Sequence, residues 1–164
     1  MSEFQVLSSR GNYRIQIKSG ALKDLPASRA VLVDPNVYTQ TSEKNVSVIN
    51  IPGNEDSKTL GYCEKILVQM HNSGITKSDH VVAFGGGVVQ DVATLVTSLY
   101  MRGIEWTYVP TTLMSMADSC IGGKSSINAG GMKNLNGNFY PPKQVLVDPV
   151  FIQTLSREAI VSGL

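Results

Sequence analysis

Residues 81–99, VVAFGGGVVQDVATLVTSL, contain the pattern that decides the fold. The run Val81–Phe84 is short and apolar and is closed by the triplet Gly85–Gly87, which is typical of a buried strand that ends in a turn. Apolar residues then recur at helical spacing from Val89 to Leu99, which predicts a helix directly after the glycines. A strand, a glycine turn and a helix in this order indicate one unit of a parallel α/β sheet.

The same alternation continues on both sides of this stretch. Short apolar runs at residues 30–33, 46–51, 106–109 and 145–147 predict further strands, and the first two suit strands buried on both faces. Helical patterns cover residues 58–72, with Ser57 as a candidate N-cap and Gly74 as the stop, and residues 111–121. We therefore expect a Rossmann-like α/β fold, with a mostly parallel sheet and flanking helices.

The two ends of the chain add to this plan. Phe4–Ser8 and Tyr13–Lys18 predict an N-terminal β-hairpin, joined through a turn at residues 10–12. Residues 156–164 begin a further helical pattern. The sequence shows no repeat or linker, and 164 residues suit one domain, so we expect a single domain over residues 1–164.

Composition excludes several classes of function. With 14 basic and 13 acidic side chains the net charge is +1, so no strong field favours nucleic acid. No apolar run approaches the roughly 18 residues of a membrane span, and the N-terminus does not resemble a signal peptide. Cys63 and Cys120 lack ligand spacing and predict reduced core thiols. We expect a cytoplasmic protein with no nucleic-acid or membrane partner.

The glycine triplet is the first candidate site. Glycines before a helix let the backbone approach a ligand, and the free N–H groups at the helix start favour a diphosphate. Asp91 lies one turn into that helix, and Asp34, at the end of an earlier strand, can bind ribose hydroxyls. The alternative for the triplet is a tight strand-to-helix turn that binds no ligand. The alternative for Asp34 is an ordinary Asp-Pro turn.

The second candidate site is the glycine-rich polar segment from residue 118 to residue 137. The sequence Gly122-Gly123-Lys124-Ser125 is not a P-loop, because Asp118 occupies the position of the first Walker glycine. Ammonium and amide groups beside exposed backbone N–H groups still suit a phosphate, although an ordinary solvated loop has the same composition. We expect this segment and the triplet to face one crevice. His71 and His80 are expected to face solvent.

Five linked motifs then resemble a known family. They are residues 85–91 (GGGVVQD), 100–103 (YMRG), 109–113 (VPTTL), 118–128 (DSCIGGKSSIN) and 133–135 (KNL), and their order and spacing resemble 3-dehydroquinate synthase, of the sugar-phosphate cyclase family. The resemblance is continuous from about residue 81 to the end.

The resemblance implies a phosphate-eliminating carbon–oxygen lyase. Such an enzyme converts 3-deoxy-D-arabino-heptulosonate 7-phosphate into 3-dehydroquinate in the shikimate route to aromatic amino acids. It uses NAD and a divalent metal, usually zinc, and we expect a homodimer when the protein is full length. A 2-deoxy-scyllo-inosose or 2-epi-5-epi-valiolone synthase, or a noncatalytic nucleotide-binding module, remains an alternative.

The resemblance also assigns roles to single residues. Asp118 is expected to hold substrate hydroxyls, Lys124 and Asn134 the phosphate end, and Arg102 the substrate of a neighbouring subunit. The residues expected around NAD are Asp34, Asn36, Glu55, Lys58, Gly86, Gly87, Val88, Asp91, Thr111, Thr112, Lys133 and Thr154.

Two departures from the family pattern stand out. Gln90 and Met132 replace glycines that are usual before the aspartate and before Lys-Asn. In the family the first metal ligand is a glutamate just beyond the position of Leu164, and two histidine ligands lie in a helical C-terminal domain. We therefore expect no metal ligands in this chain, no tight binding of zinc or substrate, and no activity by itself.

Overall fold

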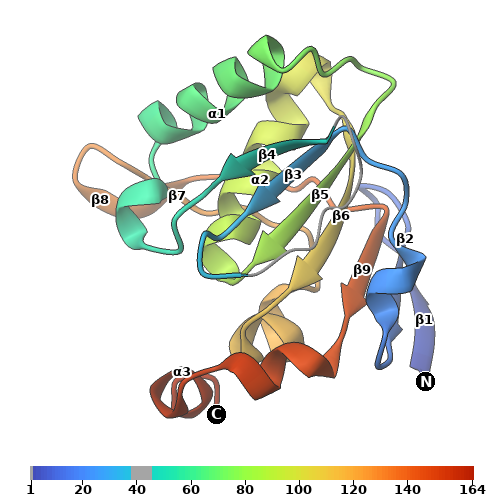
Figure 1. Cartoon of the computed structure of the whole chain (residues 1–164). Helices are drawn as coiled ribbons and strands as arrows, with labels where there is room; N and C mark the ends of the chain where they lie inside the picture. Colours follow the sequence, from blue (N-terminus) through green and yellow to red (C-terminus); the bar gives the residue numbers. More distant parts are fainter. Residues whose placement is uncertain (1, 38–45) are drawn as a thin grey trace.

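Seven strands form one sheet in the computed structural model, which describes residues 2–37 and 46–164 (Figure 1). They are β1 (Ser2–Val6), β2 (Tyr13–Ile17), β3 (Ala30–Val33), β4 (Ser47–Asn50), β5 (His80–Gly85), β6 (Glu105–Pro110) and β9 (Gln144–Val147). Their order is β1-β2-β9-β6-β5-β3-β4. Within this sheet the β1–β2 pair is antiparallel, and the other described pairs are parallel. The predicted mostly parallel sheet with an N-terminal hairpin is confirmed.

The two faces of the sheet have different covers. Helices α1 (Leu60–Asn72) and α2 (Gly87–Leu99) pack on one face, against side chains that include Val81 and Ala83 of β5. Val82 and Phe84 point to the other face and pack with residues of two 3₁₀ turns, η1 (Ala21–Asp24) and η5 (Pro149–Thr154). Because both faces are covered, the four side chains at residues 81–84 of the central strand β5 can all be apolar.

Two local predictions near α1 were wrong. Strand β4 lies at the sheet edge, so Ile49 is buried while Val48 is 48% exposed, rather than both faces being covered. The N-cap of α1 is Thr59, whose Oγ1 accepts the Tyr62 N–H at 3.2 Å. Ser57 instead ends the short turn η2 (Glu55–Ser57). Gly74, with φ of +70°, follows the end of α1 as predicted.

The chain between β6 and β9 differs most from expectation. After η3 (Tyr100–Arg102) and β6, the predicted helix 111–121 is a π-helical stretch, η4 (Ser115–Ser119). Part of the predicted polar loop is a hairpin of β7 (Ile127–Ala129) and β8 (Met132–Asn136). The hairpin lies beside α1, where Thr59 bridges to Asn128. A short helix, α3 (Arg157–Val161), follows η5.

Candidate functional site

The glycine triplet joins β5 to α2, and its three glycines serve different purposes. A Cβ on Gly85 would lie 2.4 Å from Val89 Cγ2, and one on Gly86 would lie 2.8 Å from Thr112 Cγ2, so close packing requires both glycines. A Cβ on Gly87 would meet no atom within 4 Å. The space beside Gly87 is therefore open at the start of α2, where free N–H groups and the helix dipole favour an anion.

Gly87 and Lys124 line the same cavity, whose volume is about 390 Å³. The cavity lies between the start of α2 and the chain that runs from η4 into the β7–β8 hairpin. Its other lining residues are Lys58, Gln90, Asp91, Ser119, Ser125, Ser126, Asn134, Gly137, Asn138 and Phe139. The structure thus brings the glycine triplet and the lysine-asparagine segment to one crevice.

Lys58 connects three segments at this cavity. Its side chain is only 9% exposed, and Nζ lies 3.0 Å from Asp91 Oδ2 and donates to Asn134 Oδ1 at 3.1 Å. Asp91 Oδ1 accepts the Ser126 N–H at 2.9 Å. Burial raises the pKa of Asp91, while Lys58 and the Ser126 N–H oppose that rise. The ammonium therefore stabilises a carboxylate that burial alone would disfavour.

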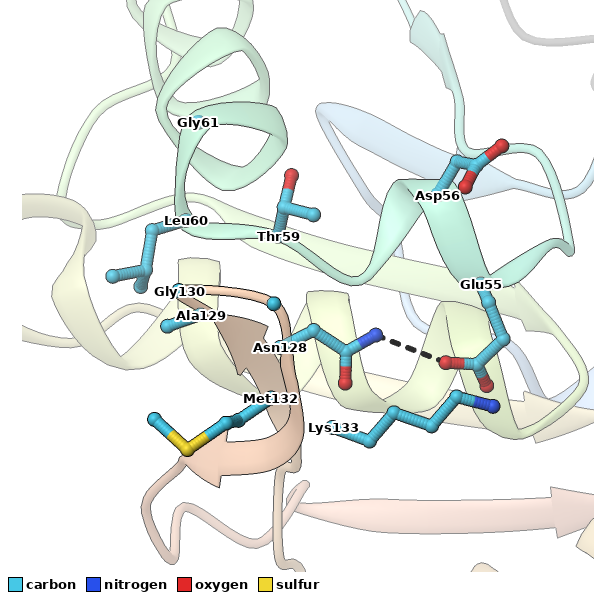
Figure 2. A pocket seen from close by; sticks show the side chains of 11 residues that line it. Glu55, Asp56, Thr59, Leu60, Gly61, Asn128, Ala129, Gly130, Met132 and Lys133 are labelled. Carbon is cyan, nitrogen blue, oxygen red and sulfur yellow. Dashed lines mark hydrogen bonds between the residues drawn. The ribbon is translucent and has the colours of Figure 1, made fainter.

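A second cavity, of about 530 Å³, lies between the start of α1 and the β7–β8 hairpin (Figure 2). Asn128 Nδ2 donates to Glu55 Oε2 at 3.0 Å, and Asn128 Oδ1 accepts the Asn134 N–H at 2.8 Å. Figure 2 shows the Lys133 side chain extending toward Glu55. The Asn128 hydrogen bond, together with Lys58 and Lys133, lowers the pKa of Glu55 although burial opposes this. The Glu55–Asn128 contact thus links this cavity to the Asn134 side of the first.

Three of the other expected cofactor residues lie close to the triplet. The Thr111 N–H donates to the Gly85 carbonyl at 3.0 Å, and Thr112 packs against Gly86. Val88 lies in the first turn of α2. These residues shape the turn from which the α2 N–H groups emerge.

The remaining expected cofactor residues lie outside both cavities. Asp34 follows β3 and accepts hydrogen bonds from the Asn36 N–H at 2.9 Å and from Asn36 Nδ2 at 3.0 Å. Thr154 is exposed at the end of η5, where Oγ1 donates to the Phe151 carbonyl at 2.9 Å. Asp34 thus lies at the carboxyl end of β3, and Thr154 lies in the turn that follows β9. Ligands of doubly wound sheets bind at these ends of the strands.

Two residues expected to touch substrate are set apart from the first cavity. Asp118 is exposed in the last turn of η4 and does not line it, although its neighbour Ser119 does. Arg102 follows the opposite end of α2 from Gly87, and a 13-residue helix is about 20 Å long. Its φ of +65° places it in the left-handed region, at an exposed turn.

Gln90 and Asn138 line the first cavity and were not expected as site residues. Gln90 is 3% exposed and hydrogen-bonds Ser119, while Asn138 hydrogen-bonds Ser125. The sequence signal that points to Gln90 is that it replaces a glycine usual before the aspartate. Nothing in the local sequence marks Asn138.

The two histidines and two cysteines do not line this cavity. His71 is exposed as predicted, but His80 is half-buried and its Nε2 lies 2.9 Å from Thr107 Oγ1, so the expectation for His80 was wrong. Cys63 and Cys120 are free and buried, as expected of core thiols. Within residues 2–37 and 46–164, no three His, Cys, Asp or Glu side chains are grouped to hold a metal.

Comparison with known proteins decides the family. A family profile described as "3-dehydroquinate synthase N-terminal" matches residues 48–162, which is most of the chain. The chain belongs to the 3-dehydroquinate synthase family. A 3-dehydroquinate synthase of Thermoanaerobacter sp. (strain X514) is 38% identical over 144 residues, covering 82% of this chain and 40% of the relative. That of Alkaliphilus metalliredigens is 37% identical over 179 aligned positions, covering 100% of this chain and 50% of the relative.

The chain spans about half the length of these curated relatives. It likewise covers about half of similar solved structures. A 2-deoxy-scyllo-inosose synthase has a TM-score of 0.85 at 22% identity, over 99% of this chain and 51% of that one. A 2-epi-5-epi-valiolone synthase from Streptomyces hygroscopicus subsp. jinggangensis 5008 was solved with NAD+ and Zn2+. It has a TM-score of 0.82 at 26% identity, and the match covers 96% of this chain and 49% of that one. The predicted Rossmann-like fold is confirmed.

No helix in the described part of the chain has both the length and the apolar character needed to cross a bilayer.

Proposed function

We propose that residues 1–164 are the NAD-binding N-terminal domain of a 3-dehydroquinate synthase. The enzyme would cyclise 3-deoxy-D-arabino-heptulosonate 7-phosphate to 3-dehydroquinate with elimination of phosphate. The observation that carries this proposal is the cavity shared by Gly87 and Lys124. Membership of the family supports the reaction class.

The start of α2 fits a dinucleotide. The open space at Gly87, next to unpaired N–H groups of the first helical turn, suits a diphosphate held along Gly86, Gly87 and Val88. Asp91 would accept hydrogen bonds from the cofactor, with its charge stabilised by Lys58. NAD, when bound, supplies transient oxidation of a substrate hydroxyl.

Further cofactor residues surround this position in the proposal. Thr111 and Thr112 shape the turn below the diphosphate, and Lys133 adds positive charge beside Glu55. Asp34, Asn36, Glu55 and Lys58 would face the adenosine part, and Thr154 would complete the set.

The lysine-asparagine segment would bind the sugar phosphate. Lys124 supplies an ammonium group to the cavity, and Asn134 supplies an amide already oriented by Lys58. Asp118 would hold substrate hydroxyls from the rim. Because Arg102 lies beyond the far end of α2, it would serve the substrate of a second subunit, which requires a homodimer of the full-length enzyme.

A divalent metal, zinc or another, is expected in the full-length enzyme. The described residues do not offer a set of three ligands, so this chain by itself is proposed to lack the metal and to be inactive. Calorimetric titration with NAD+ tests the cofactor site, and we expect saturable binding that Gly87→Val abolishes. Formation of 3-dehydroquinate by the isolated chain, supplied with substrate, NAD+ and Zn2+, would contradict the predicted inactivity.

The fold and cavity would also serve a cyclase that acts on another sugar phosphate. The likeness to a 2-epi-5-epi-valiolone synthase supports that alternative. A noncatalytic nucleotide-binding module remains a second alternative. Titration of the chain with the heptulosonate phosphate and with glucose 6-phosphate, each in the presence of NAD+, tests the alternative of a 2-deoxy-scyllo-inosose synthase, one of which was solved with carbaglucose-6-phosphate. The proposed enzyme should bind the heptulosonate phosphate in preference, whereas a noncatalytic module should bind neither sugar phosphate.

A further inference from the structure

The side chain of Gln90 reaches from α2 to η4. Gln90 Nε2 donates to the Ser119 carbonyl, and Ser119 Oγ donates to Gln90 Oε1 at 2.9 Å. Both ends of one buried amide thus bind a single residue on another segment. Because an amide offers a donor and an acceptor in fixed positions, this paired contact sets the orientation of Ser119 as well as its distance from α2.

Ser119 is the last residue of η4 and begins the turn that leads to Lys124. Carbonyl groups at the end of a helix lack partners within the helix, and Gln90 supplies one. The turn is held at two later points: the Gly122 N–H donates to Tyr13 Oη at 2.8 Å, and the Tyr140 N–H donates to the Gly123 carbonyl at 2.8 Å. Of these three anchors before Lys124, only Gln90 belongs to α2, while Asp91 of the same helix holds the chain after Lys124 by accepting the Ser126 N–H at 2.9 Å.

The other end of this connection is the start of α2. Gln90 closes the first helical turn, because its N–H donates to the Gly86 carbonyl at 3.0 Å. Its side chain also lines the cavity that Gly87 and Lys124 share. Movement of the first turn of α2 is therefore transmitted to Ser119 through one residue that is 3% exposed. A glycine at this position would have no side chain to make the contact.

We infer that Gln90 is a positioning residue that couples the two ends of the cavity. An anion at the start of α2 fixes the first helical turn, Gln90 then fixes Ser119, and the turn behind Ser119 presents Lys124 in one orientation. Binding at the α2 end and binding at the Lys124 end therefore strengthen each other by the same factor. The inference rests on the proposed function, which places NAD at one end and a phosphate group at the other.

The coupling is measured as the effect of inorganic phosphate on the affinity for NAD+. Titration calorimetry gives the NAD+ dissociation constant without phosphate and with phosphate added until that constant no longer changes. For the unaltered chain we expect phosphate to tighten NAD+ binding about five-fold or more, within the usual range of coupling between sites. Gln90→Met keeps an unbranched side chain but removes both hydrogen bonds, so the ratio of the two constants should fall most of the way to one, with the Asp91–Ser126 contact still joining α2 to the Lys124 segment.

Two further variants complete the experiment. Gln69→Met makes the same exchange on the exposed face of α1 and should retain the ratio of the unaltered chain. Ser119→Ala removes only the Oγ contact and keeps the carbonyl contact, so its ratio should be intermediate. This variant also tests the inference if Gln90→Met does not fold.

The outcomes separate the inference from the proposed function. If the Gln90 variant weakens NAD+ binding but keeps the ratio, Gln90 has only a structural role and the inference is overturned. If the unaltered chain binds NAD+ and phosphate leaves the affinity for NAD+ unchanged, the two ends are not coupled. The inference is then overturned, while the proposed cofactor site is supported. If the unaltered chain does not bind NAD+, the proposed function fails, and the inference fails with it.

Discussion

Replacing Lys58 with methionine tests the network at the cavity most severely. The substitution keeps most of the side-chain volume but removes the ammonium that lies 3.0 Å from Asp91 Oδ2 and 3.1 Å from Asn134 Oδ1. The two side chains of the ion pair are only 9% and 16% exposed, so water cannot fully replace the lost partner. The variant therefore leaves a largely buried carboxylate without its counter-ion.

The expected cost follows from that burial. Removing one partner of a buried ion pair costs about 3–5 kcal/mol. Asp91 keeps the hydrogen bond from the Ser126 N–H and can take up a proton, which reduces the cost, so we expect a loss of roughly 2–4 kcal/mol in the free energy of unfolding. Urea denaturation followed by circular dichroism at neutral pH measures this loss.

A matched control is available on the surface. Lys143 Nζ lies 3.1 Å from Glu105 Oε1, almost the same separation, but the two side chains are 61% and 62% exposed. Lys143→Met should cost less than about 1 kcal/mol. The loss in the Lys58 variant should also shrink as the pH is lowered through the raised pKa of Asp91, because a protonated carboxyl needs no counter-ion. Equal, small losses for the two lysine variants would refute the argument from burial.

Three further predictions concern the triplet, the thiols and His80. Gly85→Ala should unfold at lower temperature because its Cβ would strike Val89, whereas Gly87→Ala should melt like the unaltered chain and lose NAD+ affinity; reversed behaviour, by calorimetry, would refute the packing argument. Burial raises the pKa of Cys63 and Cys120 to about 11, so roughly one thiol in a thousand is ionised at pH 8, and labelling with a thiol reagent should require unfolding. Burial holds the pKa of His80 below 6.5, so the unfolded chain takes up the proton first. The contribution of neutral His80 to the free energy of unfolding should be fully present above about pH 6.5 and should decrease below it, and His80→Gln should lack this decrease. Urea denaturation at a series of pH values measures it.

The elements around the glycine triplet were predictable because their patterns are local. The run Val81–Phe84 is apolar at every position, and the helix after it repeats at helical spacing, so each element is visible without knowledge of its neighbours. The edge position of β4 was not visible in this way. An apolar run predicts a strand, but its place in the sheet depends on pairings between distant segments.

The candidate site was predictable as a set of residues but not as a geometry. The resemblance assigned Lys58 to the cofactor, and the structure shows that its ammonium also contacts Asn134, which lies 76 positions later. Hairpin β7–β8 likewise depends on a distant partner, since the Asn128 N–H donates to the Lys58 carbonyl at 2.7 Å. Contacts of this range leave no periodic trace, so the hairpin resembled a loop in the sequence.

A crystal structure of this chain with NAD+ and phosphate tests the central claim most directly. We predict that the diphosphate lies within hydrogen-bond distance of the Gly87 N–H and that phosphate lies beside Lys124, both in the cavity that these residues line. NAD+ seated instead between α1 and the β7–β8 hairpin, in the cavity of Figure 2, with the start of α2 unoccupied, would contradict the account.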